Sequence, residues 1–178
     1  MAEAFSNKVT RAAGIVSTSS AGAVGILTNL VTGISTVDVA VNDIIDNGQC
    51  ILGTKVSSVG ASQVVCDRDS TNTSAVTSQS VKFLGPTTAY TSTGTKSILV
   101  GGTFANNTGS QVNLTVNVFD NSASTEVGLA ANIPVPNGSS FVVSDAGKTV
   151  LESSDEIRVY CDSANAIDAT LSILTGVS

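Results

Sequence analysis

Residues 111–120 of this chain read QVNLTVNVFD. Apolar side chains alternate with polar ones over most of the stretch, at Val112, Leu114, Val116 and Val118. A period of two residues means that one face of the segment is buried and the other is solvated. The stretch therefore predicts a half-buried strand of an antiparallel sheet.

Segments of similar character lie on both sides of this strand. Gly, Asn and Pro separate them at short intervals, which is typical of a β-sandwich. We expect strands within 96–107, 139–145, 148–153, 156–163 and 166–176. The segment 124–134 predicts either a strand or a helical turn. Together these segments predict an antiparallel β-sandwich over residues 87–178.

The preceding region predicts a smaller β module over residues 23–86, either a barrel or a compact sandwich. Asn47-Gly48 and Gly60 indicate turns around an expected strand at 54–59. A closing strand is expected at 80–85, and Gly85-Pro86 then marks a boundary.

Residues 1–22 predict an extended N-terminal arm, because STSSAG at 17–22 is small, polar and unpatterned. We expect this arm to become ordered on a neighbouring subunit, with a frayed terminus as the alternative. The fold class predicted from the sequence is thus all-β, with a small N-terminal β-barrel-like module, an antiparallel β-sandwich and an extended N-terminal arm.

Charge and hydropathy argue against two kinds of partner. The chain has a net charge of −6 and its eight basic residues are scattered singly, so we expect no nucleic-acid binding. The most apolar early run, AGAVGILTNLVTGI, is interrupted by Thr28, Asn29 and Thr32, so it predicts no membrane span. The first residues also lack the basic start and apolar centre of a secretory signal.

The sequence contains no histidine. Histidine is the most frequent general base and a common metal ligand, and a Ser-His-Asp or Cys-His site needs it. The three cysteines, Cys50, Cys66 and Cys161, do not have metal-ligand spacing. Buried free thiols are expected, although a Cys50–Cys66 disulfide remains an alternative.

The triplet Gly147-Lys148-Thr149 resembles the end of a phosphate-binding loop. Such a loop needs a glycine five residues before its last glycine, and that position is Val142. It also needs a following helix, whereas Ser153, Ser154 and a β-branched segment follow here. We therefore predict no nucleotide site, and we interpret Gly147 as the positive-φ corner between two strands.

Acidic residues form two candidate clusters, Asp67 with Asp69, and Glu152 with Asp155 and Glu156. Neither matches a calcium loop, and both are expected to be solvated turns. Four Asn-x-Ser/Thr sequences, at Asn72, Asn106, Asn113 and Asn137, follow from the composition of the chain. No catalytic, cofactor-binding or metal-binding residue is predicted, so we expect a protein that is not an enzyme.

Two regions resemble a known family. IPVPNGSSFVVSDAGKTVLESSDEIRVYC at 133–161 and NAIDATLSILTGV at 165–177 resemble the C-terminal β-domain of small virion structural proteins of tailed bacteriophages, with those of marine cyanophages closest. TNLVTGISTVDVAVNDIIDN at 28–47 and GTKVSSVGASQVVCDRDST at 53–71 are similar to a β module of phage fibre, decoration and capsid-associated proteins.

The resemblance implies a non-enzymatic virion protein assembled in the host cytoplasm. The implied role is a head decoration or cement protein that bridges capsomers, with the major capsid protein and further copies of itself, as a homotrimer, for partners. In that role, residues 1–22 are expected to become ordered on the capsid or on a neighbouring subunit. A neck, collar or tail component is the alternative. A carbohydrate-binding module of a fibre is a weaker one, because it needs exposed aromatic rings and the chain has no Trp and only Tyr90 and Tyr160 besides five Phe.

Overall fold

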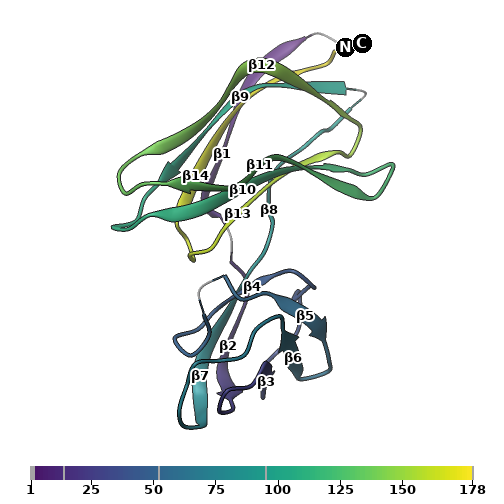
Figure 1. Cartoon of the computed structure of the whole chain (residues 1–178). Coiled ribbons are helices and arrows are strands. Elements are labelled where there is room, and N and C mark those ends of the chain that lie inside the picture. Colours follow the sequence, from purple (N-terminus) through teal and green to yellow (C-terminus); the bar gives the residue numbers. More distant parts are fainter. Residues whose placement is uncertain (1–2, 14, 52, 95, 178) are drawn as a thin grey trace. The chain divides into compact units, whose positions relative to one another are not determined.

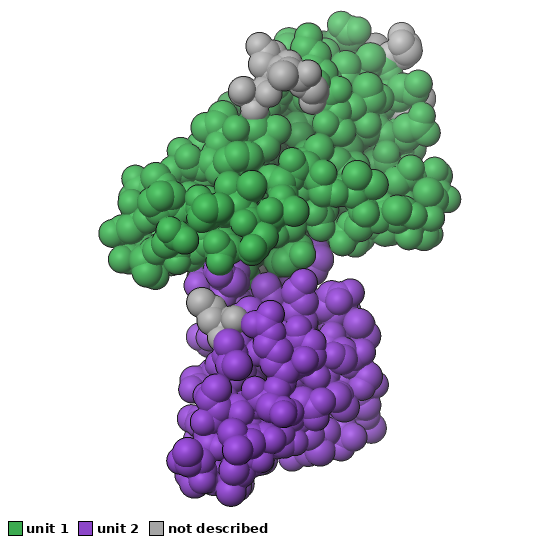
Figure 2. All heavy atoms as spheres, in the orientation of Figure 1, with its two compact units in different colours: residues 1–13, 87–161, 165–178 green, residues 14–86, 162–164 purple. Residues whose placement is uncertain are grey.

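The computed structural model is all-β, which confirms the predicted fold class. It describes residues 3–13, 15–51, 53–94 and 96–177, and for residues 12–21 and 144–147 the side chains lie outside the description. The described residues form fourteen strands and no helix (Figure 1). The chain divides into two compact units, coloured separately in Figure 2: one contains 1–13, 87–161 and 165–178, and the other contains 14–86 and 162–164.

The first unit is the predicted β-sandwich. Its two four-stranded antiparallel sheets are called sheet A and sheet C here. Sheet A has the order β1-β14-β9-β12, with β1 at Ala4–Ala13, β14 at Ile167–Thr175, β9 at Lys96–Asn106 and β12 at Ser140–Glu152. Sheet C has the order β11-β10-β13-β8, with β11 at Thr125–Val135, β10 at Val112–Asp120, β13 at Glu156–Cys161 and β8 at Thr87–Thr91.

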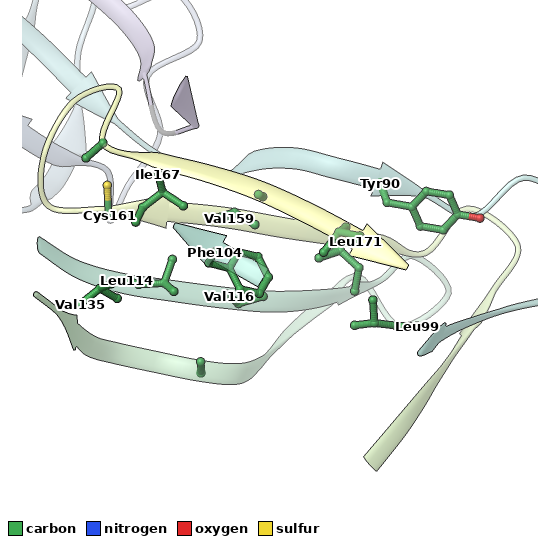
Figure 3. Packing of buried hydrophobic residues seen from close by; sticks show 14 of the residues in the cluster. Tyr90, Leu99, Phe104, Leu114, Val116, Val135, Val159, Cys161, Ile167 and Leu171 are labelled. Atoms are coloured by element: carbon green, nitrogen blue, oxygen red, sulfur yellow. The ribbon is translucent and has the colours of Figure 1, made fainter. Parts of the chain in front are cut away.

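The sandwich core is built from alternate residues of both sheets (Figure 3). Val112, Leu114 and Val116 of β10 are fully buried, as their alternation predicts, and Val118 packs against them. From sheet A, Phe104 enters the same core and stacks on Phe141, with ring centroids 6.5 Å apart. Each such buried aliphatic or aromatic side chain contributes about 1.5–3 kcal/mol through removal of apolar area from water.

The second unit is the small barrel-like module. Its six-stranded sheet has the order β4-β7-β2-β3-β6-β5, and a bridge between Ile44 and Lys55 connects the two ends, so that the sheet nearly closes. The strands are β4 at Ile44–Asp46, β7 at Val76–Leu84, β2 at Ile15–Val24, β3 at Leu30–Thr32, β6 at Gln63–Cys66 and β5 at Val56–Val59. Phe83, Val64 and Val81 lie in its core with no exposed area.

Residues 1–22 do not form a separate arm, which corrects the predicted division of the chain. Residues 4–13 pair with β14 from Ala4↔Thr175 to Ala13↔Ile167 and belong to the sandwich. Residues 15–24 pair with β7 and β3 and belong to the barrel-like module. The segment is extended, as expected, but it pairs with other strands of the chain instead of forming a separate arm. The boundary at Gly85-Pro86 agrees with the division into units.

Local predictions differ in their outcome. Asn47 does start a turn, with its carbonyl accepting from the Cys50 amide at 3.0 Å, and the Gly60 amide closes the β5–β6 turn on the Gln63 carbonyl at 2.8 Å. The segment 124–134 is a strand rather than a helical turn. The two strands predicted at 139–145 and 148–153 are one strand, β12.

Candidate functional site

The Gly147-Lys148-Thr149 triplet lies inside β12. This strand pairs with β9 on both sides of an irregularity between Ser144 and Thr149. The predicted corner between two strands is therefore a bulge within one strand, because both flanks find partners on the same neighbour. The side chains of 144–147 lie outside the described residues. A strand continues after the triplet where a phosphate-binding loop would need a helix.

The two acidic clusters have different structures. Asp67 and Asp69 are exposed after β6, as predicted, and Asp67 accepts the Lys55 amide at 2.8 Å. Asp155, in contrast, is buried, so the prediction of a solvated turn is wrong for it. Its carboxylate accepts the Glu152 amide at 2.8 Å and the Asn121 amide at 3.0 Å, which ties the β12–β13 turn to the β10–β11 hairpin.

Two of the four sequon asparagines are buried structural residues, a role the sequence analysis missed. Asn72 donates to the Val24 carbonyl at 3.3 Å. Asn106, at the end of β9, donates to three backbone carbonyls and accepts from Thr108. Asn106 comes directly before Asn-Thr-Gly-Ser at 107–110, which is a typical turn sequence. This position could have indicated that the Asn106 side chain binds the backbone of the turn.

The three cysteines are free thiols in the structure. Cys66 and Cys161 are buried and Cys50 is half-buried. Burial raises the pKa of the Cys66 thiol to about 12, with smaller contributions from Cys50 and Asp67, and burial also raises the pKa of Cys50. Thiols with raised pKa values are poor nucleophiles, so neither is suited to covalent catalysis.

Among the described residues, no group of three or more His, Cys, Asp or Glu side chains is placed to hold a metal ion. The described residues also contain no helix that is long enough and apolar enough to cross a membrane. Tyr90 is buried, and its hydroxyl lies 2.8 Å from Ser97 Oγ, so it belongs to the core and not to a binding platform.

The most unusual surface is the outer face of sheet A, called the A face here. Two cross-strand rows carry apolar residues across the sheet. The first row runs Phe5–Leu174–Ile98–Val150, and the second runs Val9–Thr170–Thr103–Val142. Phe5 is 74% exposed, Val9 76%, and Val142 and Val150 53% each. Both rows reach from one edge of the sheet to the other.

A low row separates these two rows, of which the second has threonines, Thr170 and Thr103, at its two central positions. It consists of Asn7, Ser172 and Gly101, which are aligned by the same register. Because Gly101 has no side chain, the surface is hollowed over it, and a shallow depression of about 410 Å³ is lined by Gly101, Thr103, Val142, Thr170 and their neighbours. Ser172 Oγ reaches Asn7 Oδ1 at 3.4 Å in this row.

Charges on the A face lie at its borders. Arg11 and Asp168 lie beyond the second row, and Lys96 and Glu152 lie beyond the first. Lys148 lies in the bulge of the edge strand β12. Among the described side chains of the two rows and of the low row between them, none is charged.

Strand β1 has its apolar side turned outward. Its other side carries Ser6 and Lys8, which line a polar groove of about 630 Å³ together with residues of β8 and the end of β14. No described residue of β1 belongs to the buried core of the sandwich. A strand at a sheet edge normally places its apolar residues inward, whereas Phe5 and Val9 of β1 are exposed on the A face.

The outer face of sheet C has a different character. Arg158 there donates to Glu156 Oε2 at 2.8 Å and to Glu126 Oε1 at 3.1 Å, and its guanidinium lies 3.8 Å from the centre of the Phe119 ring. Thr88 also donates to Glu156. These groups satisfy one another, so the described part of this face around Arg158 is charged and internally paired.

No protein-family model, no curated protein and no solved structure matches this chain.

Proposed function

We propose that this chain is a non-enzymatic structural protein of a tailed-phage virion, and specifically a decoration protein that stabilises the head by bridging capsomers. The major capsid protein and further copies of this chain are its partners. The observation that carries the proposal is the A face: a sheet surface whose described rows carry no charge and on which Phe5, Val9, Val142 and Val150 are exposed. Uncovered apolar surface of this kind marks a contact with another macromolecule.

The architecture supports an assembly role in a second way. Both units are all-β structures, and buried polar side chains such as Asn106 and Asp155 bind backbone groups of their own unit. The resemblance of residues 133–161 and 165–177 to virion proteins of tailed phages is the reason for proposing a phage particle as the assembly. Many copies that each bury a modest area would together give a large stabilisation of the shell, because the contacts are multivalent.

Location on the particle is tested by immunogold labelling of purified virions of the phage that encodes the chain. We expect label over the whole head. Label at the head–tail junction or along the tail would refute the decoration role and would favour a neck, collar or tail component. Binding on a glycan array would favour the carbohydrate-binding alternative, which has little support because Tyr90, Phe83 and Phe104 are buried.

The contribution of the N-terminal segment needs a sharper test than a deletion. Removing residues 2–20 would delete β1 and most of β2, so both units would lose a strand. Phe5→Ser and Val9→Ser change only exposed side chains of β1. If binding to the head depends on copies of the chain that meet through the A face, the double variant should bind isolated heads more weakly than the wild-type chain, and unchanged binding would refute that dependence.

A further inference from the structure

We propose that two copies of this chain associate face to face through their A faces. This inference rests on the proposed function only in that both require copies of the chain to meet. The occupant of the A face is thus a second copy, and four observations support it: the size of the face, its lack of charge, its shape and the pattern of charges at its borders.

The size of the A face suits a weak, reversible interface. Four strands spaced by ~4.8 Å and about nine residues rising ~3.3 Å each, charged borders included, give a face of roughly 19 by 30 Å. The resulting area of roughly 570 Å² per partner lies below the ~800 Å² of a standard interface and within the range of weak, transient contacts. Two such sheets pack at a separation of about 10 Å, as in a β-sandwich.

Charge favours the A face over the other described faces of the sandwich. The chain has a net charge of −6, so copies repel one another. Contact through the outer face of sheet C would bury the Glu126–Arg158–Glu156 cluster, in which two carboxylates share one guanidinium, in each of the two copies. Contact through the A face brings together two rows without charge, and the nearest described charge on β12 is that of Lys148, which lies in the edge-strand bulge between Val142 and Val150.

Shape makes the face complementary to itself. A two-fold axis lying in the interface, along the low row of Asn7, Ser172 and Gly101, turns one copy onto the other. This operation places the first row of one copy against the second row of the other, so Val150 of one copy faces Val142 of its neighbour. The contact is isologous and closes at two copies.

The same axis brings opposite charges near each other at the borders. Lys96 lies beyond the first row and Asp168 beyond the second, on adjacent strands. After the two-fold rotation, Lys96 of one copy and Asp168 of the other lie at the same border of the interface. An axis along the strands would instead place Lys96 near Lys96, so the charges favour the axis along the low row.

Sedimentation equilibrium of the purified full chain, over about 1–200 μM, tests the proposal. We expect a reversible dimer for the wild-type chain. Val142→Glu should raise the dimer dissociation constant at least about 100-fold, because each dimer would bury two unpaired carboxylates. Val127→Glu is the matched control: Val127 is a valine of similar exposure, 59%, but on β11 of sheet C, and its substitution should leave the constant unchanged.

A charge-pair rescue tests the arrangement itself. Val150→Lys alone should also weaken the dimer. An equimolar mixture of Val142→Glu and Val150→Lys chains should associate at least about tenfold more tightly than either variant alone, because each mixed dimer holds one Glu–Lys pair and one native contact. Circular dichroism and the thermal midpoint of each variant confirm that it is folded, as the exposure of both positions allows.

A monomeric wild-type chain up to 200 μM would overturn the proposal. Equal weakening by Val142→Glu and Val127→Glu would overturn it too, and so would a mixture no tighter than the separate variants. None of these results depends on virions, whereas the location test depends on them alone. Failure of self-association and failure of the decoration role are therefore distinguishable.

Discussion

Asn106→Ala should lower the free energy of unfolding of the sandwich by about 3 kcal/mol. Asn106 is 5% exposed at the end of β9. Its Nδ2 donates to the carbonyls of Ser110 at 2.7 Å, Val135 at 3.0 Å and Pro136 at 3.2 Å. Its Oδ1 accepts the Thr108 amide at 2.9 Å and hydroxyl at 2.7 Å. Each lost bond costs about 1 kcal/mol net, and a buried carbonyl left without a donor adds to this.

Asn106→Asp separates the donor role from the acceptor role. The aspartate keeps the size of the side chain and the contact to Thr108, but it directs a carboxylate oxygen at three carbonyl oxygens. We expect it to destabilise the sandwich at neutral pH at least as much as alanine does. Asn137→Ala is the control, because Asn137 is an exposed asparagine of a neighbouring turn and its substitution should change the free energy of unfolding by less than about 0.5 kcal/mol.

Urea unfolding followed by tyrosine fluorescence measures this effect selectively. The chain has no Trp, and both tyrosines, Tyr90 and Tyr160, lie in the sandwich unit. With a urea dependence of about 1–1.5 kcal/mol per M for a unit of this size, the midpoint should fall by about 2–3 M for Asn106→Ala. A fall below about 0.5 M, or an aspartate variant as stable as the wild-type chain, would refute the role assigned to Asn106.

Three further substitutions test the packing and the buried thiol. Gly102→Ala should destabilise the sandwich by about 1–3 kcal/mol in the same urea assay, because the added Cβ would lie 2.9 Å from Leu171 and 3.2 Å from the Phe104 ring. Gly128→Ala is the control: its nearest contact would be 3.7 Å, so it should cost less than about 1 kcal/mol. Tyr90→Phe should cost about 1 kcal/mol, measured by the thermal midpoint, because the hydroxyl lies 2.8 Å from the buried Ser97 oxygen, which would keep only its contact with Ser92 at 3.0 Å. Burial raises the pKa of the Cys66 thiol from 9.0 to about 12, so as the pH rises the thiol loses its proton first in the unfolded chain. The stability of the barrel-like module should therefore hold below about pH 9 and fall between about pH 9 and 12. Cys66→Ala should reduce that fall in unfolding curves followed by circular dichroism.

The sequence predicts those parts of the fold that short-range patterns determine. Alternation along 112–118 predicts which side chains of β10 enter the core, and the burial of Val112, Leu114 and Val116 confirms it. The proline after Gly85 predicts the boundary between the units, because neither residue continues a central strand. These features depend on neighbours within a few positions, so a single sequence contains the information.

Features that depend on distant partners were not predictable. Residues 139–145 and 148–153 look like two strands, yet both flanks pair with β9, and the bulge between Ser144 and Thr149 absorbs the extra residues. Asp155 looks like an exposed turn residue, but its second hydrogen-bond donor is the amide of Asn121, 34 positions away. Nothing within a few positions of either feature signals the partner.

Strand β1 shows how the proposed contact and the fold depend on each other. It pairs with β14, so that Ala4 lies opposite Thr175 at the other end of the chain. Closing a loop of that length carries a large entropic cost, and β1 buries none of its described side chains in the sandwich core to offset it. Its docking therefore rests on backbone hydrogen bonds. Covering Phe5 and Val9 would add apolar burial that the isolated chain lacks. Since any partner that binds only the docked form stabilises it, dimerisation through the A face and docking of β1 must strengthen each other.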